Sequence, residues 1–145
     1  VLMNFRYRCL QASTGMDTFE ASNFLGVDED AVMMWVSGDE EADEDSIEKM
    51  AELICKMVTS VGETLDYLLD SMEENDSAPA FLEMGLASDD KEAELLGWPC
   101  VRVHEMVLGM MAAQATEIGI PISIVPRGST LSSAAAADAF EEGLD

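Results

Sequence analysis

The sequence predicts a mainly α-helical fold with a small β element (α+β). Capping residues and a glycine between residues 17 and 38 predict a pair of short helices. Apolar residues from Ile47 to Met72, spaced alternately by four and three, predict one long helix, and a β-branched segment at residues 120–125 predicts a strand. We therefore expect a bundle of short helices over residues 3–45, a long helix over 46–76, a small α/β unit over 77–126 and a tail of small residues over 127–145.

The first helix of the bundle is expected over residues 3–13. Its apolar residues Phe5, Cys9 and Leu10 are spaced to face one side of a helix. We predict that this side faces the core.

Start and stop signals place the next two helices. Asp17 is expected to cap the second helix with Glu20 as its reciprocal partner, and Gly26 to end that helix in the left-handed region. Asp28 is expected to cap the third helix. The residues predicted to be buried between these caps are Phe19, Phe24, Leu25, Val27, Val32 and Trp35, with small Ala21 allowing close approach.

This pair of helices resembles the Cro and lambda-repressor type helix-turn-helix proteins. The resemblance rests on Asp17, Ala21, the Leu25-Gly26-Val27 turn, Asp28, Val32, Trp35 and Gly38. It implies a dimeric transcription regulator whose third helix reads DNA in the major groove. The residues expected at the contact surface of that helix are Asp28, Glu29, Asp30, Met33 and Met34.

The charge of the chain opposes direct DNA binding. Seven basic and thirty acidic residues give a net charge of −23, and residues 28–46 contain nine acidic residues and no basic one. DNA-binding surfaces are normally basic, because cations must replace the counterions of the phosphates. Two hypotheses remain open: a regulator that binds DNA, and an acidic protein-interaction or DNA-mimic factor, of the phage anti-restriction or anti-defence type, that binds a basic protein.

The long helix is expected to begin at a cap formed by Asp45 and Glu48. Its apolar seam predicts a homodimer interface, with packing inside one chain as the alternative. The residues expected at a dimer interface are Ile54, Val58, Val61, Leu65, Leu68 and Met72.

The carboxyl-terminal unit reads as strand, helix, helix, strand. Strands are expected at residues 78–84 and 120–125, and helices at 88–96 and 101–118. The helices supply the crossover that parallel pairing of the two strands requires. In its order of elements the chain is similar to bacterial and phage proteins with a helix-turn-helix, a long helix and a small α/β tail. The tail over 127–145 is expected either to be disordered or to contain a short helix.

No enzymatic activity, catalytic residue, cofactor or metal site is expected. His104 is the single histidine, and a lone histidine is more often a packed or surface residue than a base. The three cysteines are widely spaced, which favours neither a disulfide framework nor a zinc site. No apolar run is long enough to span a bilayer, so a cytoplasmic protein without a membrane partner is expected.

Overall fold

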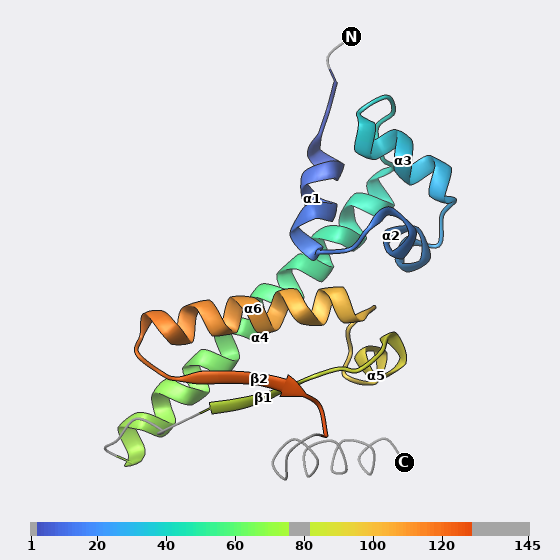
Figure 1. The fold of residues 1–145 in the computed structure, drawn as a ribbon. Coiled ribbons are helices and arrows are strands. Elements are labelled where there is room, and N and C mark those ends of the chain that lie inside the picture. Colours follow the sequence, from blue (N-terminus) through green and yellow to red (C-terminus); the bar gives the residue numbers. More distant parts are fainter. Residues whose placement is uncertain (1–2, 76–81, 129–145) are drawn as a thin grey trace. The chain divides into compact units, whose positions relative to one another are not determined.

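α-Helices dominate the computed structural model, which describes residues 3–75 and 82–128 (Figure 1). The elements are α1 (Arg6–Thr14), α2 (Thr18–Leu25), α3 (Glu29–Ser37), α4 (Glu44–Asn75), β1 (Leu82–Leu86), α5 (Asp90–Leu95), α6 (Val101–Glu117) and β2 (Ile122–Pro126). The predicted fold class, mainly α with a small β element, is confirmed. The chain divides into two compact units, Val1–Thr59 and Ser60–Asp145, so that α4 contributes to both.

The start of α2 forms as the sequence predicts. The backbone N–H of Glu20 donates to Oδ1 of Asp17 at 2.8 Å, and the backbone N–H of Asp17 donates to Oε1 of Glu20 at 3.0 Å. Gly26 ends the helix with φ 69°, a left-handed conformation that glycine adopts without a steric cost. The side-chain cap predicted for α3 does not form. Asp28 occupies the N-cap position, but its exposed carboxylate accepts no capping hydrogen bond.

The predicted core of the amino-terminal unit is correct for α3, correct only in part for α2, and wrong for α1. Ala21, Leu25, Val32 and Trp35 are buried, whereas Phe19 is 59% exposed because it lies outside the buried face that Ala21, Ser22 and Leu25 form. Phe24 and Val27 are half-buried.

The buried face of α1 consists of Tyr7, Gln11 and Thr14, while the expected Phe5 and Cys9 are exposed and Leu10 is half-buried. The ring of Tyr7 packs edge-on against Trp35 of α3, with centroids 5.2 Å apart. This aromatic contact fixes the rotation of α1. The polar Thr14 is accommodated inside because its hydroxyl donates to the carbonyl of Gln11 at 2.7 Å.

The long helix α4 begins earlier than predicted. Asp43, not Asp45, provides the cap, because its carboxylate accepts hydrogen bonds from both the backbone N–H and the hydroxyl of Ser46, at 3.1 and 2.9 Å. Asp45 lies in the first turn and pairs with Lys49 at 3.3 Å. The residues of α4 that are buried are Ser46, Ile47, Met50, Leu53, Met57, Val61, Leu65 and Leu68.

In the carboxyl-terminal unit the two strands pair in parallel, as predicted, with Leu82 opposite Ile122 and Leu86 opposite Pro126. The strands are displaced along the chain from the predicted ranges, and residues 78–81 of the first lie outside the described residues. Ile120 is buried before β2 begins. The predicted helix in the tail also lies outside the described part of the chain.

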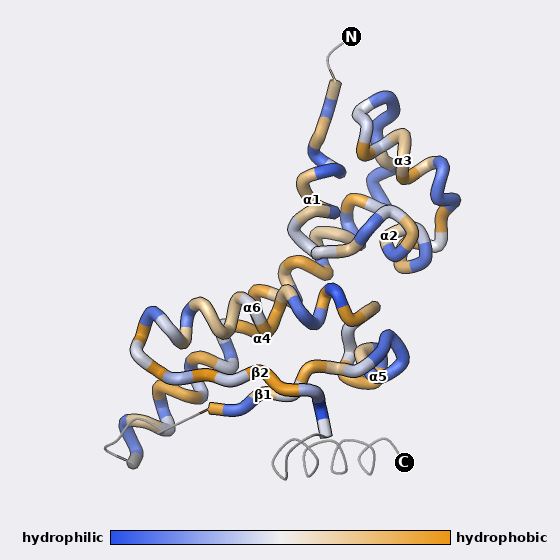
Figure 2. Tube along the Cα trace, in the orientation of Figure 1, coloured by the Kyte–Doolittle hydropathy of each residue, from blue (hydrophilic) through white to orange (hydrophobic). Residues whose placement is uncertain are grey.

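The crossover between the strands consists of α5 and α6. α6 packs against both strands, and its buried face is apolar apart from His104. In Figure 2 the strands are largely hydrophobic, whereas α5 is largely hydrophilic. A carboxylate of α5 fixes the start of α6, because Oδ1 of Asp90 accepts the N–H of Val101 at 3.0 Å.

Over residues 3–75 and 82–128, no helix combines the length and apolar character needed to cross a bilayer.

Candidate functional site

The residues predicted to contact DNA or a partner all lie on the solvent side of α3 and its cap. Asp28, Glu29 and Asp30 are exposed, and Met33 and Met34 are 55% and 38% exposed. Residues four apart on a helix are neighbours, so each methionine lies one turn from a carboxylate. Val32 and Trp35 point inward and hold the helix against the unit. The structure thus brings the five residues together as one surface, which we call the α3 surface.

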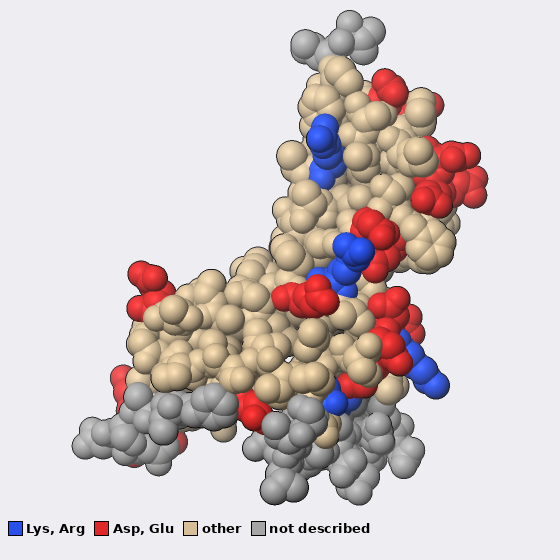
Figure 3. Space-filling view, in the orientation of Figure 1, with Lys and Arg blue, Asp and Glu red and all other residues tan. Residues whose placement is uncertain are grey.

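The α3 surface is negative, and α3 itself contains no basic residue. Figure 3 shows acidic side chains gathered near the loop between α2 and α3, while basic side chains lie over α1. Arg6 of α1 pairs with Glu44 at 2.9 Å, and the guanidinium carbon of Arg8 lies 5.5 Å from the ring centroid of Phe5. Lys49, the nearest cation along the chain, pairs with Asp45 at 3.3 Å. All three cations are therefore already engaged within the amino-terminal unit.

The residues predicted for a dimer interface differ in their burial within the chain. Val61, Leu65 and Leu68 are buried within the chain, where they form part of its own core. Ile54 and Met72 are half-buried, and Val58 is 60% exposed. Only the exposed and half-buried members can meet a second chain without unfolding the first.

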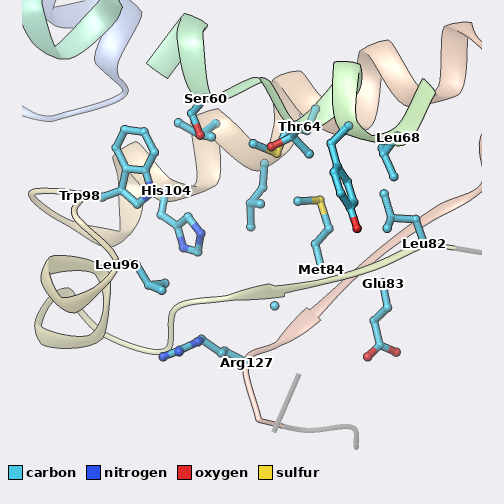
Figure 4. A pocket seen from close by; sticks show the side chains of 15 residues that line it. Ser60, Thr64, Leu68, Leu82, Glu83, Met84, Leu96, Trp98, His104 and Arg127 are labelled. Atoms are coloured by element: carbon cyan, nitrogen blue, oxygen red, sulfur yellow. The ribbon is translucent and has the colours of Figure 1, made fainter. Parts of the chain in front are cut away.

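A second candidate site, not foreseen from the sequence, is a cavity of about 520 Å³ in the carboxyl-terminal unit (Figure 4). The second half of α4, β1, the segment after α5, α6 and the residue after β2 contribute to its lining. Its apolar walls are formed by Leu68, Leu82, Met84, Leu96, Trp98, Val107, Leu108 and Met111. Its polar lining residues are Ser60, Thr64, Tyr67, Glu83, His104 and Arg127.

His104 is the most buried of these polar residues, with 6% of its surface exposed. Its Nδ1 accepts a hydrogen bond from the backbone N–H of Ala87 at 3.1 Å. Burial lowers the pKa of His104, the charge of Arg127 lowers it further, and the charge of Glu92 opposes these effects. Because Nδ1 is an acceptor, the proton of the neutral ring is on Nε2.

Arg127 links the end of β2 to α5. Its Nη1 lies 3.3 Å from Oε1 of Glu92, and the two side chains are only 6% and 23% exposed. Its backbone N–H donates to the carbonyl of Leu86 at 2.9 Å. Oε2 of Glu92 also accepts the hydroxyl hydrogen of Ser88 at 2.7 Å. These bonds hold the strand ends and α5 together beside the cavity.

The sequence contains one signal for this cavity, which is the position of His104 within the apolar pattern of α6. His104 lies in helical phase with Val107, Leu108 and Met111, which predicts that it is buried with them. The long-range partners Ala87 and Arg127 could not be inferred from that pattern, because strand register and the crossover bring them to α6.

No known family model matches this sequence, and no curated protein is significantly similar to it. Among the residues described, no three His, Cys, Asp or Glu side chains are grouped so that they could hold a metal ion.

Proposed function

We propose that the protein is a helix-turn-helix transcription regulator, with residues 3–59 as its binding module and α3 as the helix presented to the target. The observation that carries this proposal is the α3 surface, a solvent-facing row of five residues on the second helix of a tightly joined pair. A three-residue connection containing Gly26 joins α2 to α3, as helix-turn-helix motifs require.

Packing in the amino-terminal unit supports this role. The fully buried Ala21 permits the close approach of α2 and α3, and the Tyr7–Trp35 contact secures α3 from its inner side. An α-helix held in this way leaves its outer face free to enter a major groove. The apolar contacts available there come from Met33 and Met34, which can meet thymine methyl groups.

The charge of the α3 surface limits how DNA can be bound. Asp28, Glu29 and Asp30 would lie close to phosphates, whose interaction with proteins normally depends on cations. DNA binding by this helix would therefore be weak and would depend on groove contacts. The second candidate function follows from the same residues: flexible methionines bordered by carboxylates suit a basic protein partner, such as a DNA-binding protein whose cationic groove they would occupy.

We propose a homodimer, because dimeric helix-turn-helix proteins place two recognition helices in adjacent major grooves. Of the six α4 residues predicted for the interface, those left to meet a second chain are Ile54, Val58 and Met72.

A DNA titration with paired variants tests the main proposal. The combined change Glu29→Gln and Asp30→Asn removes two charges from α3, and Glu63→Gln with Asp66→Asn removes two from exposed positions of α4. If α3 faces DNA, the first pair should increase affinity for duplex DNA at low salt by about ten-fold relative to the second. Fluorescence anisotropy measures both. No binding at the lowest salt tested, or equal effects of the two pairs, would overturn DNA binding through α3.

The second candidate function predicts the opposite result, a loss of binding, when the same positions are changed. Capture of basic DNA-binding proteins from a cell lysate should weaken when Glu29 and Asp30 are changed to Ser, and should persist when Glu63 and Asp66 are changed to Ser. Unchanged capture in the first case would remove the α3 surface from that hypothesis.

A further inference from the structure

We propose that the cavity of the carboxyl-terminal unit binds an uncharged, mainly apolar small molecule that carries a hydrogen-bond acceptor, such as an aryl ketone, with Nε2 of His104 as the donor. This inference goes beyond the proposed function, since it concerns residues 60–128 and does not depend on what α3 binds.

The size and the walls of the cavity suit such a molecule. A volume of about 520 Å³ lies within the range of small-molecule sites. Leu68, Val107, Leu108 and Met111 are buried and line it, and the ring of Trp98 closes one end (Figure 4). Apolar walls around a few polar groups are the usual composition of a ligand pocket.

His104 supplies a hydrogen-bond donor that no described residue accepts. Its Nδ1 is held by Ala87, and Figure 4 shows the ring directed into the cavity. Within the described part of the chain, Nε2 donates to no protein acceptor. Because Nε2 faces the cavity and not the packed core, an acceptor atom of a bound molecule can pair with it there.

Two hydroxyl groups add a second polar position. Ser60 and Thr64 lie one turn apart on α4, both half-buried and both lining the cavity. Neither hydroxyl is hydrogen-bonded to the protein in residues 3–75 and 82–128. They can donate to or accept from a further polar atom of the ligand.

The charges around the cavity favour a neutral ligand. Arg127 is the one cation among the lining residues, and Glu92 already neutralises it. Glu83 follows the alternation of β1, so that its carboxylate lies on the other side of the strand from Met84 (Figure 4). An anion or a cation would therefore lose its hydration without gaining a free counter-charge.

A matched set of probes tests this assignment: 2-acetylnaphthalene, 2-ethylnaphthalene, which lacks the acceptor, and 2-naphthoate, which is charged. Titrations of the full chain are followed by ¹H–¹⁵N NMR, which reports both affinity and location. The ketone should bind about ten-fold more tightly than the hydrocarbon and also more tightly than the anion, with shifts at Ala87 and at residues of α6.

Two substitutions of His104 distinguish the acceptor role of Nδ1 from the donor role of Nε2. In His104→Asn, Oδ1 can replace Nδ1 as the acceptor for Ala87, but the side chain is too short for its amide N–H groups to reach the position of Nε2. In His104→Gln, the longer amide keeps a donor toward the cavity and gives up the Ala87 acceptor. The ten-fold preference for the ketone should disappear in the Asn variant and persist in the Gln variant.

A pair of threonine variants keeps the test decisive if a histidine variant fails to fold. Thr64→Val removes a hydroxyl from the cavity, whereas Thr59→Val makes the same change at an exposed position of α4. The first should weaken binding of the ketone by about three-fold or more and the second should leave it unchanged. Equal binding of ketone and hydrocarbon, shifts confined to residues 3–59, or no saturable binding would overturn the proposal.

Discussion

The backbone N–H of Ala87 donates a hydrogen bond to Nδ1 of His104 at 3.1 Å, joining the segment after β1 to the middle of α6. The bond requires an unprotonated Nδ1, because a doubly protonated ring would present a second N–H to the N–H of Ala87. The neutral histidine is therefore part of the packed structure of the carboxyl-terminal unit.

Stability should depend on pH through this histidine. Burial and the charge of Arg127 lower the pKa of His104 below its ordinary value of 6.5, so the unfolded chain binds the proton more tightly than the folded one. The stabilisation is present above pH 6.5 and is lost as the pH falls below it. Between pH 7.5 and 5.5, the wild type should lose up to about 1 kcal/mol of unfolding free energy relative to His104→Asn.

Urea unfolding of both proteins at the two pH values measures this difference. Comparison with the Asn variant cancels the effect of the many carboxylates, which both proteins share. Parallel pH dependences would show that His104 does not contribute.

Two ion pairs with the same 3.3 Å separation should differ in their importance to stability. Arg127 and Glu92 are 6% and 23% exposed, whereas Lys49 and Asp45 are both largely solvent-accessible. Glu92→Gln removes a carboxylate charge that lies 3.3 Å from a buried guanidinium and should cost about 2 kcal/mol. Asp45→Asn should change stability by less than about 0.5 kcal/mol, since exposed pairs contribute little. Chemical denaturation of both variants tests the contrast, and equal effects would contradict it.

The cap of α4 provides another contrast between two neighbouring acids. Asp43→Ala removes both hydrogen bonds to Ser46 and should lower the unfolding free energy by about 1 kcal/mol. Asp45→Ala removes only a first-turn charge and an exposed pair, and should cost about 0.5 kcal/mol or less. Thermal melts followed by circular dichroism distinguish them. A larger loss for Asp45→Ala would assign the cap to the residue expected from the sequence.

Local signals in the sequence were sufficient to predict which helices and strands form and in what order, although the caps of α3 and α4 differ from the prediction. The capping box at Asp17 and the pairing of the two strands formed as predicted. The orientation of α1 was wrong because the contact between Tyr7 and Trp35, 28 positions apart, fixes its rotation. No local pattern contains that information.

The two candidate sites also differ in whether they depend on residues close together in the sequence or on distant contacts. The five residues of the α3 surface are nearly consecutive, so one helix places them and the sequence could predict them together. The cavity brings together α4, both strand regions and α6, and its shape depends on strand register and helix packing. Periodicity could show that His104 is buried, but not that its second nitrogen faces a cavity.

The position of Val58 leads to a prediction about oligomeric state. Val58 is 60% exposed on α4, whereas Leu65, two turns further along the helix, is buried in the chain's own core. If α4 forms the dimer interface, Val58→Asp should convert dimers to monomers with little change in the stability of the monomer. Leu65→Asp should unfold the carboxyl-terminal unit whatever the oligomeric state, because it buries a carboxylate.

Thr59→Asp, which adds the same charge about 100° around the helix, is the matched control and should remain dimeric. Sizing with light scattering measures the mass of each variant, and a wild type that is monomeric at micromolar concentration would contradict dimerisation through this helix.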